Sequence, residues 1–175
     1  MKNFKIIIAS LLLVGLFSFS WPSKLDKKVK ATISKTYKLK QYDLTAIRVE
    51  ASVEKITERK VNDCLFAIKS ASETEGYIYV GEAPSMKNVF DYAILLSEDL
   101  EIVNTKVLIY REKHGRQIGM KRWLKQFFGM TSKDRPTLCY NVDGISGATI
   151  SATSMTNSVR EVLSTIEYLK RNNKL

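Results

Sequence analysis

Four apolar segments rich in β-branched and aromatic residues follow one another in the middle of the chain. They are Cys64–Ser70, Gly76–Ala83, Val89–Leu96 and Glu101–Tyr110. The polar stretches between them are too short for a helix, so consecutive strands must run antiparallel. Since the apolar face of such a sheet has to be covered, we predict an α+β fold, in which an antiparallel sheet of about four to five strands packs against helices.

One helix is predicted before these strands. Apolar residues recur there at a spacing of four, namely Leu25, Val29, Ile33 and Tyr37. This is the spacing of one helix face. The stretch 44–53 carries a weaker pattern that predicts a further strand, and the charged stretch 54–63 is interpreted as a turn.

Two helices are predicted after the strands. Gly115 and Gly119 bracket a turn, and the apolar residues beyond it fall at helical spacing until Gly129: Met120, Trp123, Leu124, Phe127 and Phe128. We interpret these aromatic residues mainly as core, with part of their surface facing a ligand. A long C-terminal helix is indicated by steps of three or four residues: Met155, Val159, Val162, Leu163, Ile166 and Leu169.

The N-terminus has the pattern of an export segment. Lys2 and Lys5 precede an apolar run from Ile6 to Phe17, and Ser18 and Ser20 supply the small residues that a signal peptidase reads. We predict that residues 1–20 are a signal peptide or, as the alternative, a short membrane anchor. Residues 21–175 then form one domain, periplasmic or at the outer face of the cytoplasmic membrane.

Charge and cysteine content exclude several classes of protein. The formal net charge is +10, but no zinc-finger spacing or RNP-like motif occurs, so nucleic acid is not an expected partner. An anionic lipid surface or an acidic partner fits the charge better. Cys64 and Cys139 either pair or remain two separately buried thiols. With His114 as the single histidine, no metal site is expected.

The entry to the C-terminal helix is unusually rich in hydroxyls. Capping of a helix requires one Ser or Thr, whereas the surplus hydroxyls, together with Gly144 and Gly147, favour an anion on the free N–H groups. The phosphate motifs GxxxxGK[ST] and GxGxxG are absent. A GxSxG hydrolase elbow fails because Ala148 occupies its last position.

The segment Asp143–Ser151, DGISGATIS, resembles the signature of the FMN-binding domain family. That signature is an Asp, a small residue, then S/T-G-A-T and another Ser or Thr. The family includes extracytoplasmic flavin subunits of the sodium-pumping NADH:quinone oxidoreductase and of Rnf-type complexes. The resemblance implies that FMN is attached through a phosphoester to Thr149 by a separate flavin transferase, which uses FAD and magnesium.

The resemblance continues upstream and implies a set of cofactor-binding residues. Glu112, Gly115 and residues 121–129 match the family layout, although its E-T-P-G-L-G is replaced by Glu112-Lys113-His114-Gly115-Arg116-Gln117. The implied contacts to FMN are Asp143, Gly144, Ser146, Gly147, Ala148, Thr149, Ile150 and Ser151, with Glu112, His114 and Gly115 near the ring. Tyr110 or Trp123 is the predicted stacking partner. Ser146, Ser151 or Thr153 would add donors to the phosphate, and Asp143 would orient the acceptor.

The function implied by the resemblance is electron transfer. The chain would relay electrons between membrane-associated redox partners, as a carrier or subunit more than as a stand-alone enzyme with catalytic residues of its own. Two alternatives remain open on the sequence. One is a flavin-dependent reductase acting on a soluble substrate, and the other is a non-redox module on the same scaffold.

Overall fold

A five-stranded antiparallel sheet is the centre of the computed structural model, which describes residues 21–71 and 73–175. Its strands are β1 (Asp43–Ala46), β2 (Leu65–Ser70), β3 (Glu73–Pro84), β4 (Val89–Leu96) and β5 (Ile102–Ile109). Each strand pairs antiparallel with the next one along the chain. The predicted α+β fold and its antiparallel sheet are therefore confirmed. The predicted signal or anchor at residues 1–20 lies outside the described residues.

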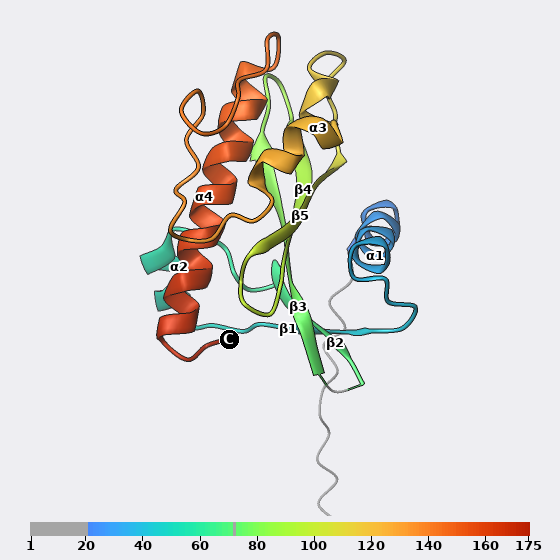
Figure 1. Ribbon diagram of the computed structural model, residues 1–175, viewed down its shortest axis with the longest axis vertical. Helices are drawn as coiled ribbons and strands as arrows, with labels where there is room; N and C mark the ends of the chain where they lie inside the picture. Colours follow the sequence, from blue (N-terminus) through green and yellow to red (C-terminus); the bar gives the residue numbers. More distant parts are fainter. Residues whose placement is uncertain (1–20, 72) are drawn as a thin grey trace, which may run out of the picture.

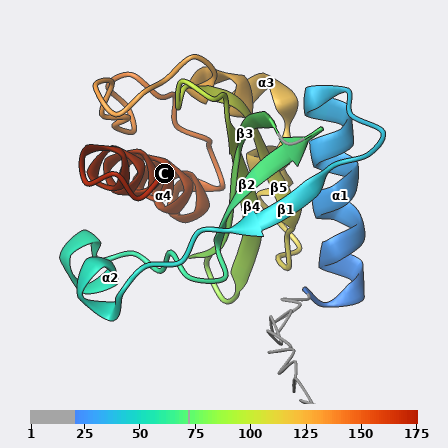
Figure 2. The ribbon, with the colours of Figure 1, turned by 90° about the horizontal axis from the view of Figure 1, so that it is seen from below.

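Helices cover both faces of the sheet. Helix α1 (Ser23–Tyr37) lies on one face and α4 (Thr149–Arg171) on the other, with the sheet between them (Figures 1 and 2). Strand β4 is buried at every position after Val89, because both of its faces are covered. The sequence required only one covered face, but the apolar run of β4, interrupted only by Asp91, is typical of a strand buried on both sides.

Helix α1 packs through three of the four apolar residues that predicted it. Leu25, Val29 and Ile33 are buried on the sheet face formed by residues of β2 to β5. At the end of the helix, the Tyr37 hydroxyl donates a hydrogen bond to the carbonyl of Leu96, at 2.7 Å. Helix α1 is thereby fixed to the sheet at its C-terminal end as well as along its length.

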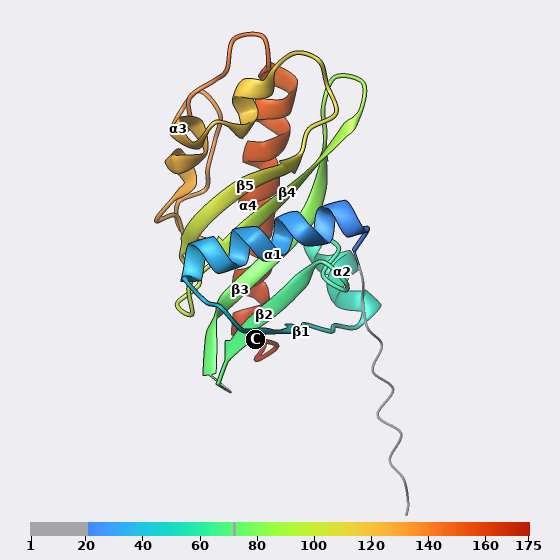
Figure 3. The same ribbon diagram turned by 90° about the vertical axis from the view of Figure 1, so that its right-hand side faces the viewer.

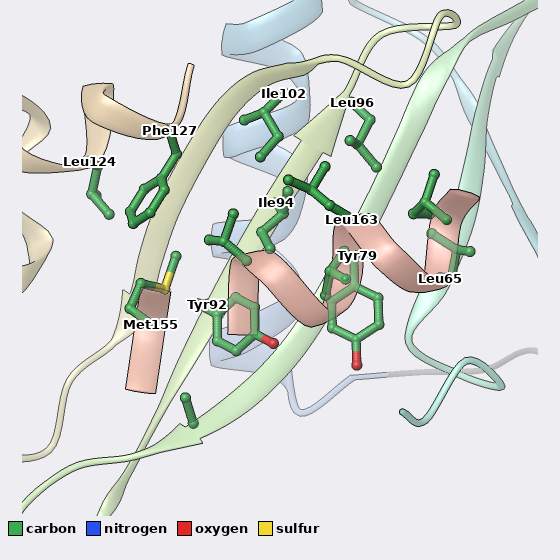
Figure 4. Close-up of a cluster of buried hydrophobic side chains, with 14 of the residues drawn as sticks. Leu65, Tyr79, Tyr92, Ile94, Leu96, Ile102, Leu124, Phe127, Met155 and Leu163 are labelled. Carbon is green, nitrogen blue, oxygen red and sulfur yellow. The ribbon is translucent and has the colours of Figure 1, made fainter. Parts of the chain in front are cut away.

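Helix α4 supplies the larger core. All six apolar residues that predicted it are buried: Met155, Val159, Val162, Leu163, Ile166 and Leu169. Figure 4 shows Met155 and Leu163 facing Tyr92, Ile94 and other side chains of the sheet. The predicted long C-terminal helix is confirmed, and its core contacts fix the position of its N-terminal residue, Thr149.

The predicted strand at 44–53 is wrong in its second half. Strand β1 ends at Ala46, and a short helix, α2 (Ala51–Thr57), takes up Val53 and the start of the predicted turn. Glu54 stabilises this helix because its Oε1 accepts the N–H groups of Val61 and Asn62, each at 2.7 Å. The charged stretch is therefore a helix held to the following turn by one of its own carboxylates.

The predicted helix at 120–128 is broken into two short pieces, α3 (Lys121–Leu124) and η2 (Lys125–Phe127). A short 3-10 helix, η1 (Arg116–Gly119), precedes them at the predicted turn. The carbonyl of Leu124 accepts a hydrogen bond from Thr105 of β5, at 3.0 Å. Tertiary contacts with β5 thus compete with the helical hydrogen bonds.

The start of the β5 edge is covered by the segment that follows η2. The N–H of Gly129 donates to the carbonyl of Ile102 at 2.8 Å, and the N–H of Ile102 donates to the carbonyl of Met130 at 2.9 Å.

Candidate functional site

Three chain segments meet around a cavity of about 620 Å³ at the N-terminal end of α4. They are the turn between β3 and β4, the stretch after β5, and the entry to α4; the cavity residues are Met86, Lys87, Asn88, Tyr110, Arg111, Glu112, Lys113, His114, Gly147, Ala148, Thr149, Ile150 and Ser151. Figures 1 and 3 show the β3–β4 turn and the start of α4 at the same end of the molecule. The structure therefore brings the hydroxyl-rich stretch and the Glu112–Gly115 segment together.

Thr149 is the first residue of α4 and is exposed. Ala148 precedes it at the N-cap position and provides no side-chain cap. Among the described residues, neither Thr149 Oγ1 nor the N–H groups of residues 149–151 have a hydrogen-bond partner. Free N–H groups at the positive end of a long helix are suited to an anion. The start of α4 thus combines a free hydroxyl with free N–H donors.

Three of the other hydroxyls near this helix start have partners of their own. Thr153 Oγ1 donates to the carbonyl of Thr149 and Ser154 Oγ to that of Ile150, each at 2.9 Å. Ser151 is buried and its Oγ shares a hydrogen bond with the Tyr110 hydroxyl, at 3.0 Å. These three hydroxyls therefore bond to their own helix or to Tyr110, which follows β5, and they do not cap the helix start.

Glu112 supports the wall of the cavity. Its Oε1 accepts hydrogen bonds from Ser85 Oγ at 2.8 Å and from the N–H groups of Lys87 and Asn88 at 2.7 and 2.9 Å. These bonds, the one from Lys87 N–H foremost, lower the pKa of Glu112 to about 2. The carboxylate is therefore ionised at neutral pH, and it holds the β3–β4 turn against the segment that follows β5.

Two glycines allow the entry to α4 and the Glu112 segment to adopt their conformations. Gly115 has a φ of +74°, and a Cβ there would lie 2.9 Å from the Tyr110 hydroxyl and 3.0 Å from Ala148 Cβ. Gly147 has a φ of +76°, but nothing lies within 4 Å of its Cβ position. Gly115 is thus required by conformation and by space, and Gly147 by conformation alone.

Some of the other predicted cofactor residues line the cavity and some do not. Asp143, Gly144 and Ser146 do not line the cavity. The N–H of Asp143 donates to Gln126 Oε1 at 2.8 Å, and its carbonyl accepts the indole N–H of Trp123 at 2.7 Å. Trp123 is a core residue, only 7% exposed, so of the two predicted stacking partners only Tyr110 borders the cavity.

Sequence reasoning missed five of the cavity residues: Met86, Lys87, Asn88, Arg111 and Lys113. Arg111 pairs with the buried Asp91 at 2.7 Å and donates to the carbonyl of Val89 at 3.0 Å, so its side chain is fixed beside the β3–β4 turn. The basic residues after β5 could have been noticed as neighbours of Glu112. The turn residues join the site only through the tertiary fold.

Neither cysteine forms a disulfide. Cys64 is half-buried and burial raises the pKa of its thiol, whereas Cys139 is exposed. The expectation of two buried thiols is therefore wrong for Cys139.

No cluster of three metal-ligating residues occurs among residues 21–71 and 73–175. Within the same residues, no helix has the length and apolar character needed to span a bilayer.

Comparison with known families gives one match. The family model of the FMN-binding domain matches residues 45–164, more than half of the chain. The matched range begins in β1, contains every residue that lines the cavity, and ends in the second half of α4. A search of curated proteins finds no match.

Proposed function

Because the chain belongs to the FMN-binding domain family, we propose that it is an electron-transfer protein that carries FMN as a phosphoester on Thr149. One observation carries the proposal. At the edge of a cavity, Thr149 presents a hydroxyl without a protein partner, beside the free N–H groups that begin α4. A covalently held phosphate needs both of these features at one place.

The cavity fits the proposed group in size and in donor chemistry. Its volume of about 620 Å³ lies within the roughly 300–1,000 Å³ of ordinary cofactor sites. Lys87, Arg111 and Lys113 supply positive charge for a phosphate, and Tyr110 supplies an aromatic ring. The Glu112 carboxylate is occupied by the β3–β4 turn, so it contributes the shape of the wall more than a free acceptor.

The residues of the site would position FMN and adjust its electrostatics. When bound, FMN would supply the reversible uptake and release of electrons. The N–H groups of residues 149–151 would offset the charge of a phosphodiester on Thr149, helped by the dipole of α4. Tyr110 is held in place by Ser151 and by its tilted contact with Phe90, at 5.9 Å between ring centroids.

Attachment would require a separate enzyme, because the chain itself does not activate Thr149. A threonine hydroxyl is a poor nucleophile without a base or a metal ion. Thr149 Oγ1 has no carboxylate or imidazole bonded to it among the described residues. A flavin transferase would take the proton from Thr149, and the oxygen would attack the FMN phosphorus of FAD with AMP as the leaving group.

We place the protein outside the cytoplasmic membrane, where it exchanges electrons with membrane-bound partners. The support is the export pattern of residues 1–20, in which basic residues precede an apolar run. Covalent attachment suits this location, since a dissociated flavin would be lost by dilution. The basic charge of the chain favours partners or surfaces of negative charge.

The test is coexpression with a flavin transferase, followed by denaturing electrophoresis and intact-mass measurement. The wild-type band should fluoresce, and its mass should rise by that of FMN less water on the peptide containing Thr149. Thr149→Val should abolish both signals. The matched control is Thr153→Val, which removes a hydroxyl one helical turn further on that bonds only to the Thr149 carbonyl.

The outcomes are distinct. A fluorescent band that survives Thr149→Val would refute attachment at Thr149. Loss of the band in Thr153→Val alone would assign the attachment to Thr153 instead. A wild-type chain without flavin, made with a transferase that modifies another family member, would instead support the non-redox module.

A further inference from the structure

A second cavity, of about 640 Å³, lies on the other side of β5 from α4, between α1, β5 and α3. Figure 3 shows these three elements close to one another. It shares no residue with the cavity at Thr149. Its volume is again that of an ordinary ligand site. This cavity has no part in the function proposed above.

Four lysines converge on this cavity from three elements. Lys28 and Lys35 come from α1, Lys106 from β5 and Lys121 from α3. No acidic residue lines the cavity, and none of the four lysines forms an ion pair within the described part of the chain. Converging cations without a counter-charge raise the local potential and attract anions. The lining therefore favours a ligand of negative charge.

Part of this positive charge is fixed in place. Lys28 Nζ donates a hydrogen bond to the carbonyl of Leu108 at 2.5 Å, which holds the ammonium group against β5. On the same wall, the Asn104 amide donates to Thr36 Oγ1 at 2.7 Å, so its Oδ1 can still accept a hydrogen bond. The cavity thus offers a fixed cation and polar groups suited to a phosphate and its hydroxyl substituents.

The lining also includes apolar residues. Val103 and Val107 of β5, Leu124 of α3 and Phe128, which follows η2, border the cavity. A site with both cationic and apolar walls is matched to an amphiphile that carries a phosphate, rather than to a small inorganic ion. The helix that forms one wall, α1, is the first element after the apolar run Ile6–Phe17 of the sequence.

From these observations we propose that the cavity between α1, β5 and α3 binds the phosphate headgroup of an anionic phospholipid. The four lysines contact the phosphodiester, and the apolar wall receives the glycerol and the first acyl carbons. Such a site would orient the domain on an anionic bilayer independently of the flavin. It extends the proposed function by a second ligand and does not depend on flavinylation.

The test titrates the detergent-solubilised full chain with water-soluble dihexanoyl-phosphatidylglycerol, with dihexanoyl-phosphatidylcholine and inorganic phosphate as the comparison ligands. A variant with Gln at Lys28, Lys35, Lys106 and Lys121 should bind phosphatidylglycerol about tenfold or more weakly. The matched control changes net charge equally, with Gln at the exposed Lys55, Lys133, Lys170 and Lys174. A second variant keeps Lys28 and replaces the other three, in case loss of the Leu108 contact affects folding.

Selective binding of phosphatidylglycerol that is lost in both cavity variants and kept in the control supports the site. Equal affinity for phosphatidylcholine overturns the role of the negative charge, and equal affinity for inorganic phosphate overturns the lipid assignment. Unchanged binding in the cavity variants overturns the site itself. Flavin fluorescence of the same proteins, made with the transferase, reports separately on Thr149.

Discussion

At the residue scale, Glu112 and Thr149 have different roles in the site. Thr149 begins a helix with its hydroxyl free, whereas Glu112 directs its carboxylate into the β3–β4 turn. The sequence motif locates Thr149 and its glycines, because those requirements are local. The upstream resemblance predicted Glu112 as a contact near the flavin ring, but its role in supporting the turn depends on Ser85 and Asn88, which are distant in sequence.

Glu112 should make stability depend on pH in the acid range. Its pKa of about 2 in the folded protein lies below the roughly 4.3 of an unfolded glutamate. The ionised Glu112 therefore contributes fully to the free energy of unfolding when the pH is above the unfolded pKa. That contribution is lost as the pH falls through the folded pKa. Urea unfolding from pH 7 to pH 2 should show a smaller loss of stability in Glu112→Gln than in wild type.

The matched control for Glu112 is Glu73→Gln, at an exposed position without an ion pair among the described residues. This variant should follow the wild-type pH curve. A Glu112→Gln curve parallel to that of wild type would show that the turn does not depend on this carboxylate.

The two glycines should differ in their tolerance of alanine. Gly147→Ala should cost about 1 kcal/mol of unfolding free energy, the usual cost of a left-handed backbone conformation. Gly115→Ala should cost more, because the new methyl group also meets Tyr110 and Ala148. Denaturant unfolding of both variants checks the order, and equal losses would remove the steric argument for Gly115.

At the scale of elements, the apolar periodicity of the sequence predicted the strands and helices that have a long, regular apolar pattern. The central strands and α4 have long, regular apolar periodicities, and both were predicted correctly. Helix α2 was missed because only Val53 of it is buried, which leaves little periodicity to read. The helix expected at 120–128 is broken near Leu124, whose backbone carbonyl accepts a hydrogen bond from Thr105 of β5. The β3–β4 turn joins the cavity through the pairing of β3 with β4 and through its hydrogen bonds to Glu112, and the sequence pattern encodes neither.

Helix α1 should contribute strongly to stability through its apolar face. Ile33 is fully buried between α1 and the sheet, so Ile33→Ala should reduce the unfolding free energy by about 2–5 kcal/mol. The same substitution at Ile56, which is 63% exposed, should change it by less than about 0.5 kcal/mol. Denaturant unfolding of the two variants is the measurement, and a small effect at Ile33 would show that α1 is only loosely attached.

At the scale of the whole molecule, the sheet separates two different sites. The flavin-type cavity lies at the end where α4 begins, and the lysine-lined cavity lies by α1 on the opposite face. Figure 1 shows α4 and α1 on either side of the sheet. The two proposed ligands, FMN and a phospholipid headgroup, would therefore occupy separate surfaces, so that neither one obstructs the other.

The carrier should exchange electrons with membrane partners and show little activity alone. The sequence has no GxGxxG dinucleotide motif, so the isolated flavinylated chain should oxidise NADH only slowly in stopped-flow absorbance measurements. Membranes that contain its partners should reduce it much faster. Rapid turnover of NADH or another soluble donor by the isolated chain would favour the reductase alternative.

The edges of the sheet restrict how another protein can join this one. Strand β1 has only four residues, and the start of β5 is already bonded to Gly129 and Met130, with α3 packed alongside. Short or covered edges oppose the addition of a foreign strand, which is the step shared by β-augmentation and fibril growth. These edges favour recognition through side chains, and a contact made by complementary surface charges can be brief enough for the proposed electron exchange.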